Sequence, residues 1–394
     1  MKLKQQPKDF QVEELTDFAP GSTGAFSFYR LEKQGWTTPD AILVICRRWH
    51  IDRRRISFGG LKDRHAVTIQ HLTIYRGPER NLTHQRLKLA YLGKIAEPFT
   101  SAFIRANRFR LILRALTSAQ ISAAEIALNE VQADGIPNYF DDQRFGSVGR
   151  AGDFMARPLL AGHYEDALRK ALLTPYEFDR KGQKKDKELL RKHWGDWPSC
   201  RQLSRQSPAR GPVAHLVRHP DDFQGALTCL PADLRGLYLS AYQSHLWNRM
   251  LARWLRTHLE HRDLLSVHLC LGDVPMHRGL LESLRQELAQ LHLPLPSGRM
   301  ELDPADPRQQ VLEAILQEEG IQQEQLKLKG FKEMFFSRGE RSAIFRPAHL
   351  VYEHADDDLN SGREKLILAF ELPRGAYATL LVKRITAGSA VPEG

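Results

Sequence analysis

The sequence predicts a mixed α+β protein in which one domain is interrupted by the insertion of another. Its 394 residues exceed the usual length of a single domain, about 100–200 residues. Strand-like segments occupy roughly the first 150 residues and return after Arg341, and the stretch between them differs in composition. We therefore expect one domain over residues 1–152 and 336–394 and an inserted domain over residues 153–335.

The overall composition is that of a globular protein with a basic surface. The chain is 42% hydrophobic and 26% charged, which excludes collagen-like, low-complexity and wholly disordered polypeptides. Its 57 Lys+Arg against 47 Asp+Glu give a net charge of +10, and such a surface attracts polyanions. Nucleic acid is therefore the leading candidate partner, although many basic proteins of this size bind none.

The cysteines and the apolar segments indicate a reduced, non-membrane protein. The four cysteines, Cys46, Cys200, Cys229 and Cys270, are scattered and form no Cys-x-x-Cys pair. No apolar run approaches the roughly 18–20 residues of a membrane span. We expect a cytoplasmic protein with free thiols and no membrane partner.

Local signals predict the first strands and the first helix. Phe10 and Val12 alternate with polar neighbours, as in a strand, and a second strand is expected over residues 25–31. The run Thr38-Pro39-Asp40 offers a hydroxyl cap, a proline at the first helical position and an acid in the first turn. A helix should therefore begin there and end near His50.

The next elements surround one acidic residue. Residues 56–58 and 68–75 are expected to form neighbouring strands, and Asp63 falls in the loop between them. Residues 109–113 predict another strand, and residues 118–132 predict a helix. The apolar positions of that helix are Ile121, Ala124, Ile126 and Leu128.

The longest helix is predicted over residues 234–259. Its apolar side chains recur at three- and four-residue spacing, which is typical of a face turned to a core. They are Trp247, Met250, Leu251, Trp254 and Leu255. After Arg341, strands are expected at residues 366–370 and 377–385.

Two motifs that suggest metal or nucleotide binding do not meet the requirements of those sites. His215 and His219 lie one turn apart but lack the Glu of a His-Glu-x-x-His site. The glycines of residues 146–152 have neither the dinucleotide-binding nor the Walker spacing. We therefore expect no metal site.

Two features of the N-terminal part suit a bound polyanion. Five arginines crowd nine positions, and guanidinium groups donate in pairs to phosphate oxygens; the alternative is a solvated helix end. They are Arg47, Arg48, Arg53, Arg54 and Arg55. The second feature is Asp63, which follows two glycines and is flanked by Lys62 and Arg64. A carboxylate inside a basic, polyanion-binding surface suits a nucleophile or base that acts on a bound nucleotide.

Four stretches, in matching order and spacing, resemble the TruD family of pseudouridine synthases. They are Lys4-x-x-Pro7-x-Asp9-Phe10-x-Val12-x-Glu14, Gly60-Leu61-Lys62-Asp63 with Ala66-Val67-Thr68 and Gln70, Asn138 to Gly146, and Leu372-Pro373-x-Gly375-x-Tyr377-Ala378-Thr379. Residues 239–244, ahead of Asn248, are similar to a helix of the family's middle region. The chain departs from the family at Asp141, where glycine is common, and at Glu14, which lies one place after the usual acid.

The resemblance implies a pseudouridine-synthase catalytic domain with a mixed sheet, interrupted by an inserted α/β domain specific to this family. The reaction implied is the isomerisation of a specific uridine in tRNA to pseudouridine, at position 13 in the D arm. It needs no cofactor and no metal. The bond from ribose to the uracil nitrogen breaks, the base turns, and carbon 5 joins the same ribose carbon.

The resemblance also assigns roles to individual residues. The essential carboxylate is Asp63, which is ordinarily ionised at neutral pH and would attack the sugar carbon or remove its proton. The target base must first leave its stack. The residues expected to bind the substrate are Phe10 and Phe140 by stacking, Asn138 by hydrogen bonding, Lys62 and Lys4 by charge, and Gln70 and Arg144 from the same motifs. For each phenylalanine the alternative is simple core packing.

The expected partner is tRNA, bound by a monomer. The alternative function is a non-catalytic RNA-binding protein or RNA chaperone of the same fold, against which the intact Lys62-Asp63 pair argues. A methyltransferase is disfavoured because no glycine-rich cofactor loop follows a strand.

Overall fold

The computed structural model describes residues 1–149, 152–176, 179–204 and 207–387. The chain divides into two compact units, one formed by Met1–Ile136 with Phe345–Gly394 and the other by Pro137–Ile344. The short strands β9 (Ile136–Pro137) and β14 (Ile344–Phe345) lie where the chain passes from one unit to the other.

The unit boundaries differ from those expected at residues 152 and 336. Residues 137–149 belong to the second unit because they are fastened to its longest helix. The side chain of Asn248 donates to the Phe140 carbonyl and accepts from the Phe140 N–H, each at 2.8 Å. The Tyr139 hydroxyl donates to the carbonyl of Pro275 at 2.8 Å.

The first unit contains a ten-stranded mixed sheet, which agrees with the predicted fold class. Its main path runs β15-β16-β8-β2-β5-β3-β7-β6, while β1 pairs with β8 and β4 pairs with β5. The pairing of β2 with β5 is parallel, and the other pairings along this path are antiparallel. The strands are β1 (Lys2–Leu3), β2 (Phe10–Leu15), β3 (Phe26–Gln34), β4 (Ile56–Phe58), β5 (Val67–Tyr75), β6 (Leu82–His84), β7 (Leu87–Ile95), β8 (Ala106–Leu116), β15 (Ala348–Asp356) and β16 (Glu364–Pro373).

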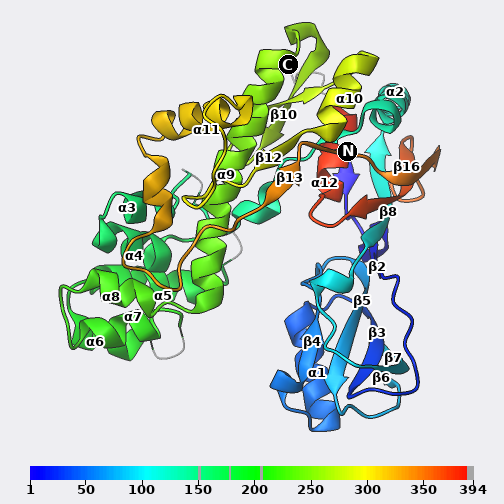
Figure 1. Ribbon diagram of the computed structural model, residues 1–394. Coiled ribbons are helices and arrows are strands. Elements are labelled where there is room, and N and C mark those ends of the chain that lie inside the picture. The colour runs from blue at the N-terminus through cyan, green and yellow to red at the C-terminus, as the bar shows by residue number, and fades with distance from the viewer. Residues whose placement is uncertain (150–151, 177–178, 205–206, 388–394) are drawn as a thin grey trace. The chain divides into compact units, whose positions relative to one another are not determined.

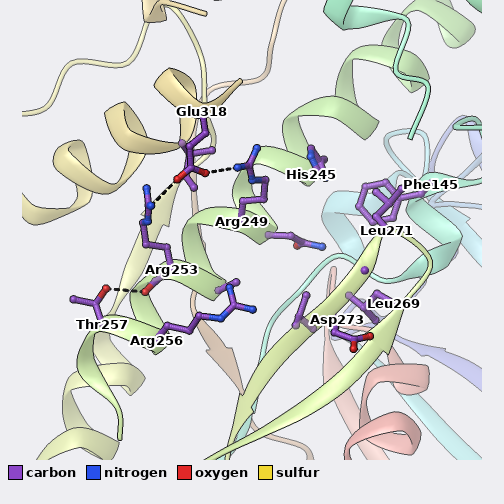
Figure 2. Close-up of a pocket in the computed structure, with 15 residues that line it drawn as sticks. Phe145, His245, Arg249, Arg253, Arg256, Thr257, Leu269, Leu271, Asp273 and Glu318 are labelled. Carbon is purple, nitrogen blue, oxygen red and sulfur yellow. Dashed lines mark hydrogen bonds and ion pairs between the residues drawn. The ribbon is translucent and has the colours of Figure 1, made fainter. Parts of the chain in front are cut away.

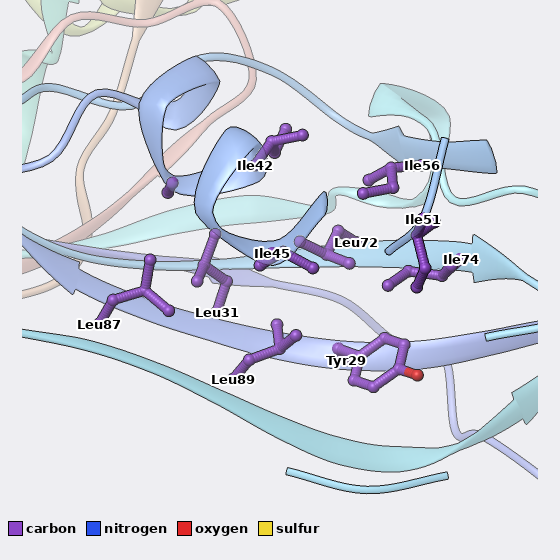
Figure 3. Close-up of a cluster of buried hydrophobic side chains, with 11 residues drawn as sticks. Tyr29, Leu31, Ile42, Ile45, Ile51, Ile56, Leu72, Ile74, Leu87 and Leu89 are labelled. Atoms are coloured by element: carbon purple, nitrogen blue, oxygen red, sulfur yellow. The ribbon is translucent and has the colours of Figure 1, made fainter. Parts of the chain in front are cut away.

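Helix α1 (Thr38–Trp49) covers one part of this sheet, as Figure 3 shows. Ile42 and Ile45 from the helix pack against Leu31 and Leu72 from the strands, within a larger buried cluster. The N-cap is Thr37, whose hydroxyl accepts from the Asp40 N–H at 3.1 Å, rather than the expected Thr38. The helix ends as predicted, at a left-handed His50.

Two further helices of the first unit correct the sequence predictions. Helix α2 (Ser118–Asp134) has the expected start, but Ile126, which was expected on its apolar face, is 64% exposed. Residues expected to form a strand at 377–385 instead form helix α12 (Ala378–Thr386). Its buried Leu381 and Ile385 are four residues apart, which is a helical spacing.

Short 3-10 helices lie at η1 (Pro7–Asp9), η2 (Arg53–Arg55) and η3 (Ser101–Phe103).

The second unit is mainly helical and is organised on α9 (Ala232–His258), the long helix labelled in Figure 1. The predicted apolar face of this helix is buried at all five positions. The other helices are α3 (Ala156–Leu160), α4 (Tyr164–Leu173), α5 (Lys181–Lys192), α6 (Trp197–Leu203), α7 (Arg210–Leu216), α8 (Phe223–Thr228), α10 (Glu282–Gln290), α11 (Pro307–Glu318), η4 (Asp142–Phe145), η5 (His261–Asp263) and η6 (Gln323–Lys327). Two small antiparallel pairs complete the unit, β10 (Leu264–Leu269) with β11 (Gly272–His277) and β12 (His292–Pro294) with β13 (Glu340–Ser342).

Among the helices of the described residues, none combines the length and the apolar character that crossing a membrane would require.

Candidate active site

The candidate catalytic residue, Asp63, lies in the loop that joins β4 to β5. These strands pair antiparallel, with Phe58 opposite Leu72, so the loop leaves the sheet and returns to it. The side chain of Asp63 is 37% exposed. A carboxylate on a loop between paired strands is both accessible to a substrate and held by a rigid frame.

The Lys4 ammonium lies between Asp63 and an aromatic ring. Its Nζ is 2.7 Å from Oδ2 of Asp63 and 3.9 Å from the centre of the Phe10 ring. Lys4 has a φ of 60°, a left-handed conformation that is uncommon outside glycine. Phe10 is 5% exposed and meets Phe109 edge to face at 6.1 Å. The structure thus brings together three residues named from the sequence, Lys4, Phe10 and Asp63.

Lys62 neutralises a different carboxylate from the one beside it in the chain. Its Nζ lies 3.1 Å from Oε1 of Glu14 and donates to Oδ1 of Asn107 at 2.8 Å. Glu14 is buried, and its Oε2 accepts from the His71 N–H at 2.8 Å. Burial raises the pKa of Glu14, although the positive charge of Lys62 opposes the rise. The ion-pair partner of Lys62 is therefore Glu14 and not Asp63.

Gln70 and Thr38 hold the backbone of the Asp63 loop by hydrogen bonds. Gln70 is fully buried, and its Nε2 donates to the carbonyl of Gly60 at 3.2 Å. The Thr38 hydroxyl donates to Oε1 of Gln70 at 2.8 Å and accepts from the Lys62 N–H at 3.0 Å. Both polar ends of Gln70 are thus engaged within the protein, so its contacts fix the loop backbone.

Lys33 is a buried residue of this site that the sequence predictions did not include. Its side chain is 1% exposed, and its Nζ donates to the carbonyls of Lys62 at 3.2 Å and Asp63 at 3.0 Å. The signal was present in the strand pattern, because Lys33 alternates with polar neighbours on the same side as buried Leu31. A lysine at an inward position of a strand is unusual unless it has partners.

The N-terminal segment that carries Lys4 is held by a buried ion network. Arg114 lies 3.0 Å from Asp9 and 2.8 Å from Asp357. Burial opposes the charge of the guanidinium, but hydrogen bonds to three carboxylates raise the pKa of Arg114 overall. A Cβ on Gly59, at the start of the loop, would lie 2.5 Å from Cδ1 of Ile104, so a side chain there would require Ile104 to shift.

The arginine cluster expected to bind phosphate has local partners for three of its members. Arg53 donates to the carbonyl of Ile56 at 2.8 Å. Arg54 pairs with Asp52 at 2.7 Å, and Arg55 donates to the carbonyl of Tyr75 at 2.9 Å. Arg53 and Arg55 thus hold η2 against β4 and β5, whereas the Arg54 side chain is 89% exposed beside Asp52.

Asn138, Phe140 and Arg144 belong to the second unit, whereas Lys4, Phe10, Lys62, Asp63 and Gln70 belong to the first. Oδ1 of Asn138 accepts from Arg341 at 2.6 Å, and its Nδ2 donates to the carbonyl of Ser342 at 3.0 Å. Arg144 donates to the hydroxyl of Ser244 at 3.0 Å.

Phe140 is packed as a core residue. It is 8% exposed and meets Trp247 edge to face at 5.6 Å. The guanidinium carbon of Arg341 lies 4.1 Å from the centre of its ring. Arg341, which joins Asn138 to Phe140, is a second residue of this group that the sequence predictions missed, since it lies 203 positions after Asn138.

A cavity of about 370 Å³ lies between α9 and the β10–β11 hairpin in the second unit. Figure 2 shows Arg249 and Arg253 from α9 reaching Glu318, with Phe145 and Leu271 among the other lining residues. Arg253 and Glu318 are 2.6 Å apart. Arg249 also pairs with Glu319, so both arginines have carboxylate partners within the second unit. Within the described ranges, no group of three or more His, Cys, Asp or Glu side chains could hold a metal ion.

Comparisons with known proteins agree on one family. Residues 1–385 match the family described as tRNA pseudouridine synthase D (TruD). A Methanococcus maripaludis protein named "Probable tRNA pseudouridine synthase D 1" is 32% identical, with 98% of this chain and 99% of that protein covered. The tRNA pseudouridine synthase D of Aquifex aeolicus is 29% identical, with 98% of each chain covered.

A solved structure supports the fold. A crystal structure of a Methanosarcina mazei protein described with the TruD name has a TM-score of 0.70 at 23% identity, and covers 98% of this chain and 93% of its own. The mixed sheet and helices described above are thus those of a known architecture. This chain therefore belongs to the tRNA pseudouridine synthase D family and is an enzyme of that isomerase class.

Proposed function

We propose that this enzyme isomerises the uridine at position 13, in the D arm of tRNA, to pseudouridine with the carboxylate of Asp63 and without a cofactor. The observation that carries the proposal is the partly exposed Asp63 carboxylate, 2.7 Å from the Lys4 ammonium, on a loop whose backbone is held at Gly60 and Lys62. Family membership supports the reaction, and the loop supports the choice of residue.

The chemistry requires one bond to break and one to form at the same ribose carbon. The bond from that carbon to N1 of uracil is cleaved, and a bond to C5 replaces it. The proton of C5 is lost, and N1 gains one, so the product is an isomer of the substrate. The Asp63 carboxylate would assist in one of two ways. It would displace N1 from the sugar carbon and then be displaced in turn by C5, or it would take a proton from the adjacent ribose carbon as uracil leaves and return it when C5 bonds.

Lys4 and Phe10 define how a base would reach Asp63. The Lys4 ammonium covers the Phe10 ring and occupies one carboxylate oxygen. A uracil can stack on this ring only after the ammonium moves, and a phosphate of the RNA is a natural new partner for it. We propose that substrate entry transfers Lys4 from Asp63 to the RNA.

The remaining residues have supporting roles in this proposal. Lys62 and Gln70 position the loop that carries Asp63, through Glu14 and Gly60 respectively. In the second unit, Asn138 orients Arg341 over the buried ring of Phe140, and Arg341 and Arg144 contact the tRNA. We assign the catalytic domain to the first unit, the family-specific insertion to the second, and the active form to a cytoplasmic monomer.

The test uses two tRNA transcripts and no added cofactor. The enzyme is incubated with an unmodified transcript whose uracils carry tritium at C5, and released tritium is measured, since C5 loses its hydrogen. A matched transcript with cytidine at position 13 serves as control. Release from the first alone, in a stoichiometry of one per tRNA, supports the proposal. Equal release from both transcripts contradicts the position, and binding of both without release favours the RNA-chaperone alternative.

A further inference from the structure

The Lys33 ammonium is buried with its hydrogen-bonding capacity filled by main-chain carbonyls. Its Nζ donates to Trp36 at 2.9 Å, to Lys62 at 3.2 Å and to Asp63 at 3.0 Å. An ammonium has three N–H donors, so these three carbonyls use all of them. Burying a cation whose hydrogen bonds all go to neutral carbonyls costs free energy, so completing a strand does not by itself account for Lys33.

Two of the three carbonyls that Lys33 binds flank the Cα of Asp63. The Lys62 carbonyl precedes Asp63, and the Asp63 carbonyl follows it, so the two peptide units on either side of the Asp63 Cα are both tied to one atom. The third carbonyl, of Trp36, belongs to the turn between β3 and α1. The ammonium thus fastens the Asp63 loop to the rigid end of β3.

Because the Asp63 Cα is held on both sides, we propose that Lys33 is a positioning residue for the isomerisation, which fixes the reactive carboxylate by clamping its flanking carbonyls. This inference rests on the proposed catalytic role of Asp63. It adds that protonation of a residue outside the substrate-binding surface controls the geometry of the reaction.

The burial and charged neighbours of Lys33 predict how the activity depends on pH. Burial lowers its pKa to about 8; the negative charge of Asp63 opposes this shift and the positive charge of Lys62 adds to it. As pH rises through this value, the amine keeps two donors for three carbonyls, and the loop loosens. Activity should therefore fall above pH 8.

Folding stability should respond to pH with the opposite sign. A lysine whose folded pKa lies below its ordinary 10.5 binds its proton less tightly in the folded state, so its contribution to stability increases as pH rises from about 8 toward 10.5. A purely structural lysine would thus not produce a loss of activity accompanied by unchanged or higher stability. The two readouts separate positioning from folding.

The experiment compares Lys33→Met with Lys33→Arg and the control Lys88→Met. Lys88 is an exposed lysine on the neighbouring strand β7. Steady-state kcat and KM are measured from pH 6 to pH 10 on an unmodified tRNA transcript. Thermal unfolding is measured at each pH. Misplacing a reactive group by about 1 Å costs on the order of 100-fold in rate, so Lys33→Met should lose at least about tenfold in kcat with little change in KM.

The pH profiles carry the decision. The parent enzyme and Lys88→Met should lose activity with a midpoint near pH 8. Lys33→Met and the permanently charged Lys33→Arg should show no fall in activity around that pH. A fall in activity near pH 8 that persists in both Lys33 variants would overturn the inference, as would an unchanged kcat in Lys33→Met. If Lys33→Met does not fold, Lys33→Arg and the parent profile still decide.

The inference and the proposed function fail in different ways. Retained turnover in Asp63→Asn would refute the catalytic role of Asp63, and the clamp would then have no reactive group to position. An inactive Asp63→Asn beside an unaffected Lys33→Met would refute the clamp alone.

Discussion

Replacing Asp63 by asparagine should abolish pseudouridine formation while leaving the fold and tRNA binding intact. The amide keeps the shape of the side chain but lacks its charge and nucleophilic oxygen. The lost ion pair with Lys4 is partly exposed, with side chains 37% and 22% accessible, so its loss costs about 0–1 kcal/mol of stability. For a domain of this size that corresponds to a fall in Tm of at most about 4 °C.

Turnover and binding are measured on the same protein preparation. Tritium release from the labelled transcript gives the single-turnover rate, and fluorescence anisotropy gives the Kd for tRNA. Removing an anion from a surface that binds a polyanion should leave the Kd unchanged or lower it. A rate within about tenfold of the parent, a barrier change of only ~1.4 kcal/mol, would refute the assignment of Asp63.

Asp52→Asn is the matched control for this substitution. Asp52 is also an exposed carboxylate with a cation partner, Arg54 at 2.7 Å, and lies in the same basic part of the chain. Both variants lose one negative charge and one surface ion pair. Asp52→Asn should therefore match Asp63→Asn in Tm and in tRNA binding but retain the parent rate.

The other predictions test cofactor use and packing. Activity on pre-folded tRNA should survive exhaustive chelation in polyamine buffer, and a loss restored specifically by zinc would reveal an overlooked site. Phe140→Ala should lower the free energy of unfolding by ~3–5 kcal/mol, because the ring packs against Trp247; an unchanged denaturation curve would instead favour an exposed stacking platform. Arg114→Met should destabilise the first unit by ~3–5 kcal/mol, since Asp9 and Asp357 would remain buried without their cation, and a stability loss below ~1 kcal/mol would show that the network is dispensable.

The sequence predicts the loop of Asp63 well because the signals are local. Two strands, two glycines and the flanking lysine lie within about 20 consecutive residues, and the strands form where expected. The start of α1 was predicted within one residue, but Thr37 rather than Thr38 is the cap. The hydroxyl of Thr38 is thereby left to bridge Gln70 and Lys62, a contact between elements that no capping rule contains.

The contacts missed from the sequence connect residues that are distant along the chain. Lys33 reaches carbonyls about 30 positions away, and Arg341 reaches Asn138 across the whole second unit. The partners of Lys33 are main-chain carbonyls, which leave no trace in side-chain identity, so no motif marks them. The strand expected at residues 377–385 failed for another reason, since a short apolar run fits strand and helix equally well until its packing partner is known.

The order of the strands has a consequence for how this protein is made on the ribosome. Strand β8 lies between β2 and β16, and the stacked rings of Phe109 and Phe370 join β8 to β16 at 5.5 Å. Translation therefore delivers β8 more than two hundred residues before its second neighbour, and at about 5–20 residues per second this hydrogen-bonding edge waits for tens of seconds at the slower speeds. During that time the contiguous second unit emerges complete and can fold first. The sheet of the first unit is therefore completed last, so chains that stop before Glu364 should present an open strand edge to chaperones and proteases.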